Sequence, residues 1–175
     1  MDATTRLRKA IRDIPDFPKP GILFKDITPL LADADYLGLA LDLFESRWRP
    51  DGVEVVAAIE ARGFILGGAL ADRLGAGFVP LRKPGKLPAK TRRVEYALEY
   101  GTDALEIHDD ALAGGPRTLV VDDVLATGGT AAAACRLVRE AGGSLMGVAF
   151  LVNLAFLEGA KKLSGIPMQS LVEYA

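Results

Sequence analysis

Residues 119–130 read Leu-Val-Val-Asp-Asp-Val-Leu-Ala-Thr-Gly-Gly-Thr, and this stretch decides the fold. It begins with the apolar, β-branched residues of a buried strand, and four alanines follow it at 131–134, as in the first turns of a helix. Two adjacent carboxylates and a loop of small residues lie between this strand and this helix. We therefore expect a strand–loop–helix unit of the kind that builds parallel α/β sheets.

The loop in this stretch has the composition of an anion site. It comprises Ala126, Thr127, Gly128, Gly129 and Thr130. Small residues let successive backbone N–H groups converge, and the start of the following helix adds a positive dipole end, so a phosphate fits there. Asp122 and Asp123 would repel a phosphate, but ionised carboxylates accept hydrogen bonds from sugar hydroxyls. The stretch therefore predicts a site for a phosphorylated sugar.

Apolar runs and helical patterns alternate along the chain. Apolar runs predict strands at 53–59, 78–81, 118–122, 144–152 and 168–173. Helical patterns predict helices at 4–11, 35–47, 63–74, 130–141 and 156–163, the second capped by Asp35, and the proline-rich segment 16–29 is interpreted as an ordered loop. This alternation favours an α/β fold, a mainly parallel sheet with helices on both faces. Ligands bind such sheets beyond the carboxyl ends of the strands, where the loops after Ile59, Leu81 and Asp122 meet.

Residues 82–110 interrupt this alternation. Six cations come first, without an acid among them: Arg82, Lys83, Lys86, Lys90, Arg92 and Arg93. Six acids then follow, and apolar residues alternate with polar ones between 94 and 100, as in a strand with one solvated face. We expect a two-stranded flap whose basic half is mobile without substrate, because it has little apolar anchorage. A solvated hairpin with no role in ligand binding is the alternative.

Composition excludes several kinds of protein. With 175 residues, half of them hydrophobic, the chain suits one domain with a substantial core. A formal charge of −2 gives no general attraction for nucleic acid. No signal-peptide core and no membrane-spanning apolar run are present, so we expect no nucleic-acid partner, no membrane partner and a cytoplasmic location. Cys135 is the only cysteine, so neither an internal disulfide nor a cysteine metal cluster is expected.

Residues 119–130 resemble the phosphoribosyl-diphosphate (PRPP) signature of the type I phosphoribosyltransferases. Four further segments are similar, in order and spacing, to the adenine phosphoribosyltransferases: 17–29, 60–64, 82–88 and 98–101. The resemblance spans residues 14–173. It implies the type I phosphoribosyltransferase fold in a single domain, 1–175, with an N-terminal arm and hood at 1–34 and a flexible flap at 83–101.

The resemblance also implies an activity, transfer of the 5-phosphoribosyl group from PRPP to adenine, giving AMP and diphosphate in purine salvage. It assigns PRPP binding to Asp122, Asp123 and the loop Ala126, Thr127, Gly128, Gly129 and Thr130. It assigns adenine binding to Leu23, Phe24 and Lys25, where Lys25 replaces the arginine common in the family. Glu99 is the implied acid/base group, and Tyr100 would close over the reacting ring.

The chemistry of the implied reaction requires cations and a metal ion. The leaving diphosphate needs positive charge, for which Arg62, Arg82, Lys83 and Lys86 are the candidates. Mg²⁺ is the expected ion, bound mainly through PRPP oxygens and without a protein metal cage. The lone His108 is more typical of a structural or solvated residue than of a metal ligand.

Two other functions remain open from the sequence. One is transfer to another purine, such as xanthine or guanine, although the hood segment 17–29 argues against it. The other is a non-catalytic regulator that senses PRPP or purines. The resemblance further implies a homodimer in which Arg82 reaches the diphosphate site of the neighbouring subunit.

Overall fold

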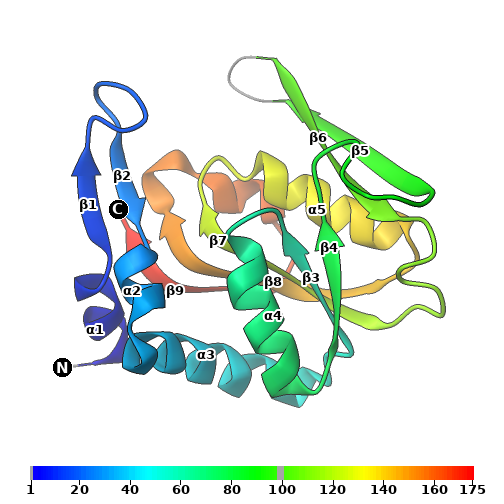
Figure 1. The fold of residues 1–175 in the computed structure, drawn as a ribbon, viewed down its shortest axis with the longest axis horizontal. Helices are drawn as coiled ribbons and strands as arrows, with labels where there is room; N and C mark the ends of the chain where they lie inside the picture. Colours follow the sequence, from blue (N-terminus) through cyan, green and yellow to red (C-terminus); the bar gives the residue numbers. More distant parts are fainter. Residues whose placement is uncertain (1, 98–100) are drawn as a thin grey trace.

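Parallel strands form the centre of the molecule. The structure is a computed structural model that describes residues 2–97 and 101–175. In these residues, the main sheet has five strands in the order β4-β3-β7-β8-β9, all parallel (Figure 1). They are β3 (Val55–Ile59), β4 (Gly77–Leu81), β7 (Arg117–Leu125), β8 (Ser144–Leu154) and β9 (Met168–Tyr174). The predicted α/β fold with a mainly parallel sheet is confirmed.

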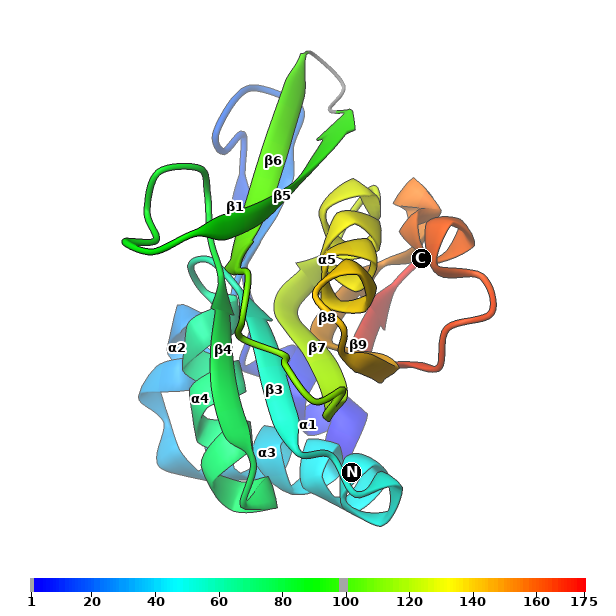
Figure 2. The same cartoon turned by 90° about the vertical axis from the view of Figure 1, so that its right-hand side faces the viewer.

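The two faces of the sheet carry separate hydrophobic cores, because side chains alternate across a strand. One face packs against α1 (Ala3–Lys9), α2 (Thr28–Ala32), α3 (Ala34–Trp48) and α4 (Gly63–Leu74). The other packs against α5 (Gly129–Glu140) (Figure 2). Leu119 and Val121 of β7 point into the first core and Val120 into the second. Helices therefore cover both faces, as predicted.

The segment that interrupts the alternation is a hairpin beside α5. Its strands are β5 (Thr91–Ala97) and β6 (Thr102–His108), paired antiparallel with Thr91 opposite His108. Val94 and Tyr96 of β5 are buried in the core of α5, whereas Arg93 and Glu95 face solvent. The predicted two-stranded flap with one solvated face is confirmed. The basic residues before them, Lys86, Lys90, Arg92 and Arg93, are exposed, in line with the little apolar anchorage expected of this half, and its mobility stays a prediction.

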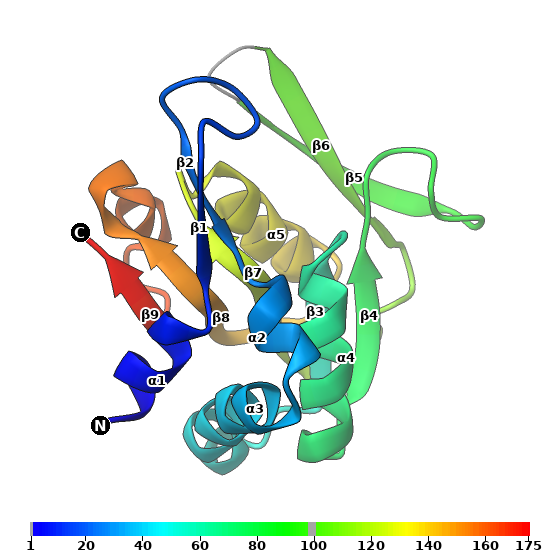
Figure 3. The same cartoon turned by 60° about the vertical axis from the view of Figure 1, so that its left-hand side comes forward.

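A second hairpin forms the N-terminal hood (Figure 3). It pairs β1 (Arg12–Pro15) with β2 (Leu23–Asp26) antiparallel, so the segment predicted as a loop contains a strand. Ion pairs between the strands, Arg12 with Asp26 and Lys25 with Asp13, hold them together. These cross-strand contacts link residues more than ten positions apart, and the helix predicted at 4–11 ends instead at Lys9.

The start of α3 and the last predicted helix also differ from the predictions. The N-cap of α3 is Asp33 rather than Asp35, because the Asp33 carboxylate accepts hydrogen bonds from the backbone N–H groups of Asp35 and Tyr36. The helix predicted at 156–163 is two short 3-10 helices, η2 (Ala155–Leu157) and η3 (Gly159–Leu163). Glu158 separates them with a φ of 55°, which is incompatible with a continuous α-helix. Another 3-10 helix, η1 (Arg49–Asp51), follows α3.

The helices that the structure describes include none long and apolar enough to cross a membrane.

Candidate active site

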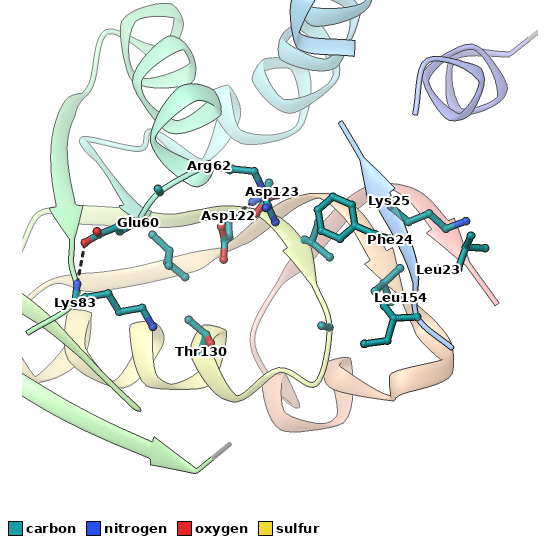
Figure 4. A pocket seen from close by; sticks show the side chains of 15 residues that line it. Leu23, Phe24, Lys25, Glu60, Arg62, Lys83, Asp122, Asp123, Thr130 and Leu154 are labelled. Carbon is teal, nitrogen blue, oxygen red and sulfur yellow. Dashed lines mark hydrogen bonds and ion pairs between the residues drawn. The ribbon is translucent and has the colours of Figure 1, made fainter. Parts of the chain in front are cut away.

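A cavity of about 470 Å³ lies between the hood and the carboxyl ends of β3 and β7 (Figure 4). Its walls come from segments far apart in the sequence. Of the residues predicted for the site, it is lined by Leu23, Phe24, Lys25, Arg62, Lys83, Asp122, Asp123, Ala126 and Thr130. Glu60 and Leu154 line it as well, although neither was predicted. The fold thus joins the hood, the acid pair and both ends of the phosphate loop in a single cavity.

The phosphate loop encloses a second, smaller cavity of about 90 Å³. Of these two cavities, Thr127, Gly128 and Gly129 line the smaller one and not the larger, whereas Ala126 and Thr130 line both. The helix α5 begins at Gly129, so the first backbone N–H groups of the helix have no partner within it and point toward the loop. A small cavity with free N–H donors and a helix N-terminus suits an anion next to the larger cavity.

Gly128 lies in this loop, and its backbone packs against the backbone of Gly159. Gly128 has a φ of +78°, a conformation that favours glycine. A Cβ on Gly128 would lie 2.3 Å from the carbonyl oxygen of Gly159, and a Cβ on Gly159 would lie 2.2 Å from that of Ala126. Backbone therefore packs directly on backbone at the start of η3. Sequence analysis missed Gly159, because nothing in its local pattern indicates contact with residue 128.

The two acids of the signature are not equivalent. The strand β7 continues to Leu125, so Asp122 and Asp123 lie within it and point to opposite faces. Asp123 is 5% exposed and its carboxylate accepts a hydrogen bond from Arg62. Burial, followed by the charge of Asp123, raises the pKa of Asp122 well above its usual range. The pair therefore combines one ion-paired carboxylate with one that resists ionisation.

The four predicted cations occupy different places. Lys83 lines the cavity, and its ammonium contacts Asp103 and the hydroxyl of Tyr96 on the flap. Burial disfavours the charged lysine, but the hydrogen bonds to Asp103 and Tyr96 outweigh it and raise the pKa of Lys83. Arg62 also lines the cavity, where it pairs with Asp123 instead of standing free for a diphosphate.

Arg82 and Lys86 do not line the cavity of their own chain, and their expected contacts with the diphosphate stay predictions. The Nε of Arg82 lies 3.1 Å from Glu60 Oε2, and the backbone N–H of Lys83 donates to the same oxygen at 2.9 Å. These hydrogen bonds outweigh burial and lower the pKa of Glu60. Lys86 is exposed, and its carbonyl oxygen accepts a hydrogen bond from Arg82. Glu60 thus orients the strand end that carries Arg82 and Lys83.

The hood contributes one aromatic ring to the cavity. Phe24 packs edge-on against Phe17, with ring centroids 5.1 Å apart, and the guanidinium of Arg62 lies 5.5 Å from the centre of its ring. The side chain of Lys25 points away from the Phe24 ring, on the other side of β2 (Figure 4). The Lys25 ammonium is instead paired with Asp13 of β1, 2.6 Å away.

The predicted acid/base residue Glu99 and the predicted closing residue Tyr100 lie outside the described residues. Their assigned roles stay predictions. The nearest described parts of the flap are Ala97, at the end of β5, and Gly101, just before β6.

The chain is similar to proteins of known class. The sequence profile of the phosphoribosyl transferase domain family matches residues 32–166. The adenine phosphoribosyltransferase of Sorangium cellulosum is 56% identical over 174 residues, which cover 97% of this chain and 87% of that protein. The crystal structure of adenine phosphoribosyltransferase from Thermoanaerobacter pseudethanolicus has a TM-score of 0.94 and 51% identity, covering 98% of this chain and 99% of that one.

A more distant structure shows what such a protein binds. The adenine phosphoribosyltransferase of Saccharomyces cerevisiae, solved with an imino-altritol bisphosphate and adenine, has a TM-score of 0.92 and 37% identity, covering 97% of this chain and 98% of that one.

These matches agree with the geometry of the site, which defines a phosphoribosyltransferase. The matched profile covers most of the chain, and the relatives above share one name over nearly their full length. The chain therefore belongs to the adenine phosphoribosyltransferase family.

Proposed function

We propose that the protein transfers the 5-phosphoribosyl group of PRPP to adenine, giving AMP and diphosphate in purine salvage. One observation carries the proposal. A single cavity joins the hood segment, the acid pair and Lys83, and it shares the lining residues Ala126 and Thr130 with the small cavity of the phosphate loop. A base, a ribose and a 5′-phosphate can thus bind side by side, in the order in which AMP links them.

The acid pair and the loop would hold the ribose phosphate. The N–H groups and hydroxyls at 126–130 suit the 5′-phosphate, and the carboxylates suit the ribose hydroxyls, which donate hydrogen bonds. Displacement of diphosphate at the anomeric carbon develops positive charge on the sugar, as in glycoside chemistry. The negative charge of Asp123 beside the ribose stabilises that charge, and Lys83 is the lining cation best placed to meet the diphosphate.

The hood would read the base. Among the described strands, β2 is hydrogen-bonded to β1 alone. The backbone N–H and C=O groups on its other edge can therefore bind a ligand. One backbone C=O and one N–H can together recognise the 6-amino donor and the N1 acceptor of adenine, and hypoxanthine presents the reverse pattern. The yeast relative binds adenine, which supports adenine over xanthine or guanine.

The cavity fits an ion that is carried by the substrate. The acidic lining side chains supply carboxylate oxygens from Glu60, Asp122 and Asp123, the ligand type that Mg²⁺ prefers. When bound, Mg²⁺ would neutralise charge on the diphosphate. Its ligands would come chiefly from PRPP. Coordination would also favour the ionised form of Asp122.

A second copy of the chain would complete the diphosphate site. The edge strand β4 and helix α4 expose Phe78, 40% accessible, and Ile65, 49% accessible. Arg82 follows β4 on the same edge and lies outside its own subunit's cavity, so a homodimer across this edge gives it a role. Light scattering of the active enzyme tests this: a fully active monomer would contradict it. The cytoplasmic location stays a prediction.

The activity is tested by product stoichiometry. Purified protein incubated with PRPP, Mg²⁺ and adenine should form AMP and diphosphate in a 1:1 ratio, and a chelator should stop the reaction. Hydrolysis of PRPP to ribose phosphate without AMP, or no turnover at all, would contradict the proposal.

A further inference from the structure

The hood hairpin needs a support that holds it over the cavity. Its strands β1 and β2 belong to a two-stranded sheet of their own, separate from the main sheet. The end of β9 lies close to this hairpin (Figure 1). The penultimate residue of the chain, Tyr174, ends β9 and contacts the hood there.

Lys25 makes this contact. Its ammonium lies 4.0 Å from the centre of the Tyr174 ring and 2.6 Å from Asp13 Oδ1, directly across the hairpin. The Lys25 side chain is only 8% exposed, so the contact is largely shielded from solvent. A cation over an aromatic ring is attracted more strongly when it is desolvated.

Arg8 strengthens the same junction from α1. Its guanidinium lies 4.8 Å from the centre of the Tyr174 ring and donates a hydrogen bond to the carbonyl oxygen of Glu173. Burial and the nearby charge of Asp13 raise the pKa of the Tyr174 hydroxyl. The side chain is therefore a neutral ring at physiological pH, and it is the ring that the two cations contact.

Tyr174 also lies next to the part of the main sheet that lines the cavity. In the β8–β9 register it pairs with Leu154, which lines the cavity. The residue thus adjoins two walls at once, the hood strand through Lys25 and the sheet through Leu154. No part of Tyr174 lines the cavity itself.

We propose that Tyr174 is a positioning residue for the base, which fixes the hood strand Leu23–Asp26 relative to the sheet and so sets the affinity for adenine. The ring holds Lys25, and Lys25 holds the backbone edge that faces the base. The 5′-phosphate loop lies on other elements and is not held by this contact. This inference rests on the proposed adenine activity.

Kinetics of three variants test the inference. Tyr174→Leu should raise the KM for adenine about 3- to 30-fold, the range that a desolvated cation–ring contact spans, and should leave the KM for PRPP unchanged. Tyr174→Phe keeps the ring and should restore the wild-type value. Lys25→Met removes the same contact together with the ion pair to Asp13, so its defect should be at least as large, and adding Tyr174→Leu to it should raise the KM for adenine no further.

A matched control distinguishes the effect of the Tyr174–Lys25 contact from that of losing any cation–ring contact. Arg47 lies 4.3 Å from the Trp48 ring on α3, so Arg47→Met removes a cation from a ring away from the cavity and should leave both KM values unchanged. Equal rises in the two KM values, a Tyr174→Phe variant as impaired as Tyr174→Leu, or additive defects would overturn the inference. Should Tyr174→Leu fail to fold, Tyr174→Met, which also lacks the ring, decides. A wild-type chain that forms no AMP would instead reject the proposed function.

Discussion

The Nε–H of Arg62 donates a hydrogen bond to the carboxylate of Asp123, although the two residues are 61 positions apart in the sequence. The pair joins the loop after β3 to the strand β7. The same guanidinium approaches the ring of Phe24, so one side chain connects the acid pair with the hood. We therefore expect ribose and base binding to be coupled through Arg62, and removing the charge of its partner should affect catalysis more than folding.

Asp123→Asn should lower kcat/KM about 10- to 1,000-fold, equivalent to about 1.4–4 kcal/mol. The carboxamide keeps the shape and can still accept a hydrogen bond from Arg62, so the melting temperature should change little. Steady-state kinetics and calorimetry measure the two quantities. The exposed Asp110→Asn, in the turn after β6, is the control. Near wild-type turnover of Asp123→Asn would remove this carboxylate from the mechanism.

Asp122→Asn should make the folded protein more stable at neutral pH and at the same time less active. The pKa of Asp122 is raised in the folded protein, so its charged form opposes folding. Its contribution to stability is fully present below the ordinary value of 3.8 and is lost as the pH rises through the raised value.

Asn stays neutral, so Asp122→Asn should raise the melting temperature at pH 8 more than at pH 4. Activity should fall about 10- to 150-fold, the value of a hydrogen bond to a charged group. Thermal melts of the unliganded protein at both pH values provide the measurement. An equal change at both pH values would show that Asp122 is ionised in the folded protein.

Gly128→Ala should weaken PRPP binding at least about tenfold, because a left-handed alanine costs roughly 1–2 kcal/mol before any clash. The added Cβ would also displace Gly159 or the loop. Gly165 has the same φ of +78° and open space around it, so Gly165→Ala measures the backbone cost alone.

Gly159→Ala should resemble Gly128→Ala, since it meets the same backbone contact from the other side. Calorimetric titration with PRPP and with adenine distinguishes the two sites. Equal losses for both ligands would show that the glycine contact supports the whole cavity rather than the phosphate loop.

Trypsin should cut the unliganded protein first at Lys86 and Lys90, in the exposed loop before β5. Arg92 and Arg93 lie within the strand, where Arg92 pairs with Asp109 and Arg93 with Glu95. Saturating PRPP and Mg²⁺ should slow cleavage, as Lys83 leaves Asp103 for the diphosphate and the loop closes. Mass spectrometry of the fragments identifies the sites. Cleavage rates independent of ligand would mean that the flap is not a lid.

Local patterns predicted most of the fold. The helix 63–74 has its predicted bounds, because its apolar pattern ends at Gly75, which caps it with a left-handed φ. The strand β2 was not predicted, because the prolines in 16–29 favour a loop in any local reading. Its pairing with β1 is stabilised by ion pairs between the two strands, which a local pattern does not contain. The break at Glu158 and the cap at Asp33 depend on single backbone conformations that periodicity does not record.

The sequence predicted most of the residues that line the candidate site, but it did not predict which side chains they contact. The acid pair and the phosphate loop are contiguous in the sequence, so their proximity follows from one motif. Which cations reach the cavity depends on tertiary partners, as the pairs of Arg82 with Glu60 and Lys83 with Asp103 show. The support by Gly159 and the contact of Tyr174 with Lys25 join distant segments, and no local pattern encodes them.

A competition between bases tests the central claim most directly. The protein is incubated with PRPP, Mg²⁺ and equal concentrations of adenine, hypoxanthine, guanine, xanthine and orotate in one reaction, and the nucleotides are separated by chromatography over time. We predict that AMP forms and that adenine alone is consumed, with one diphosphate released per AMP. Nucleotide formed only from a base other than adenine would contradict the account.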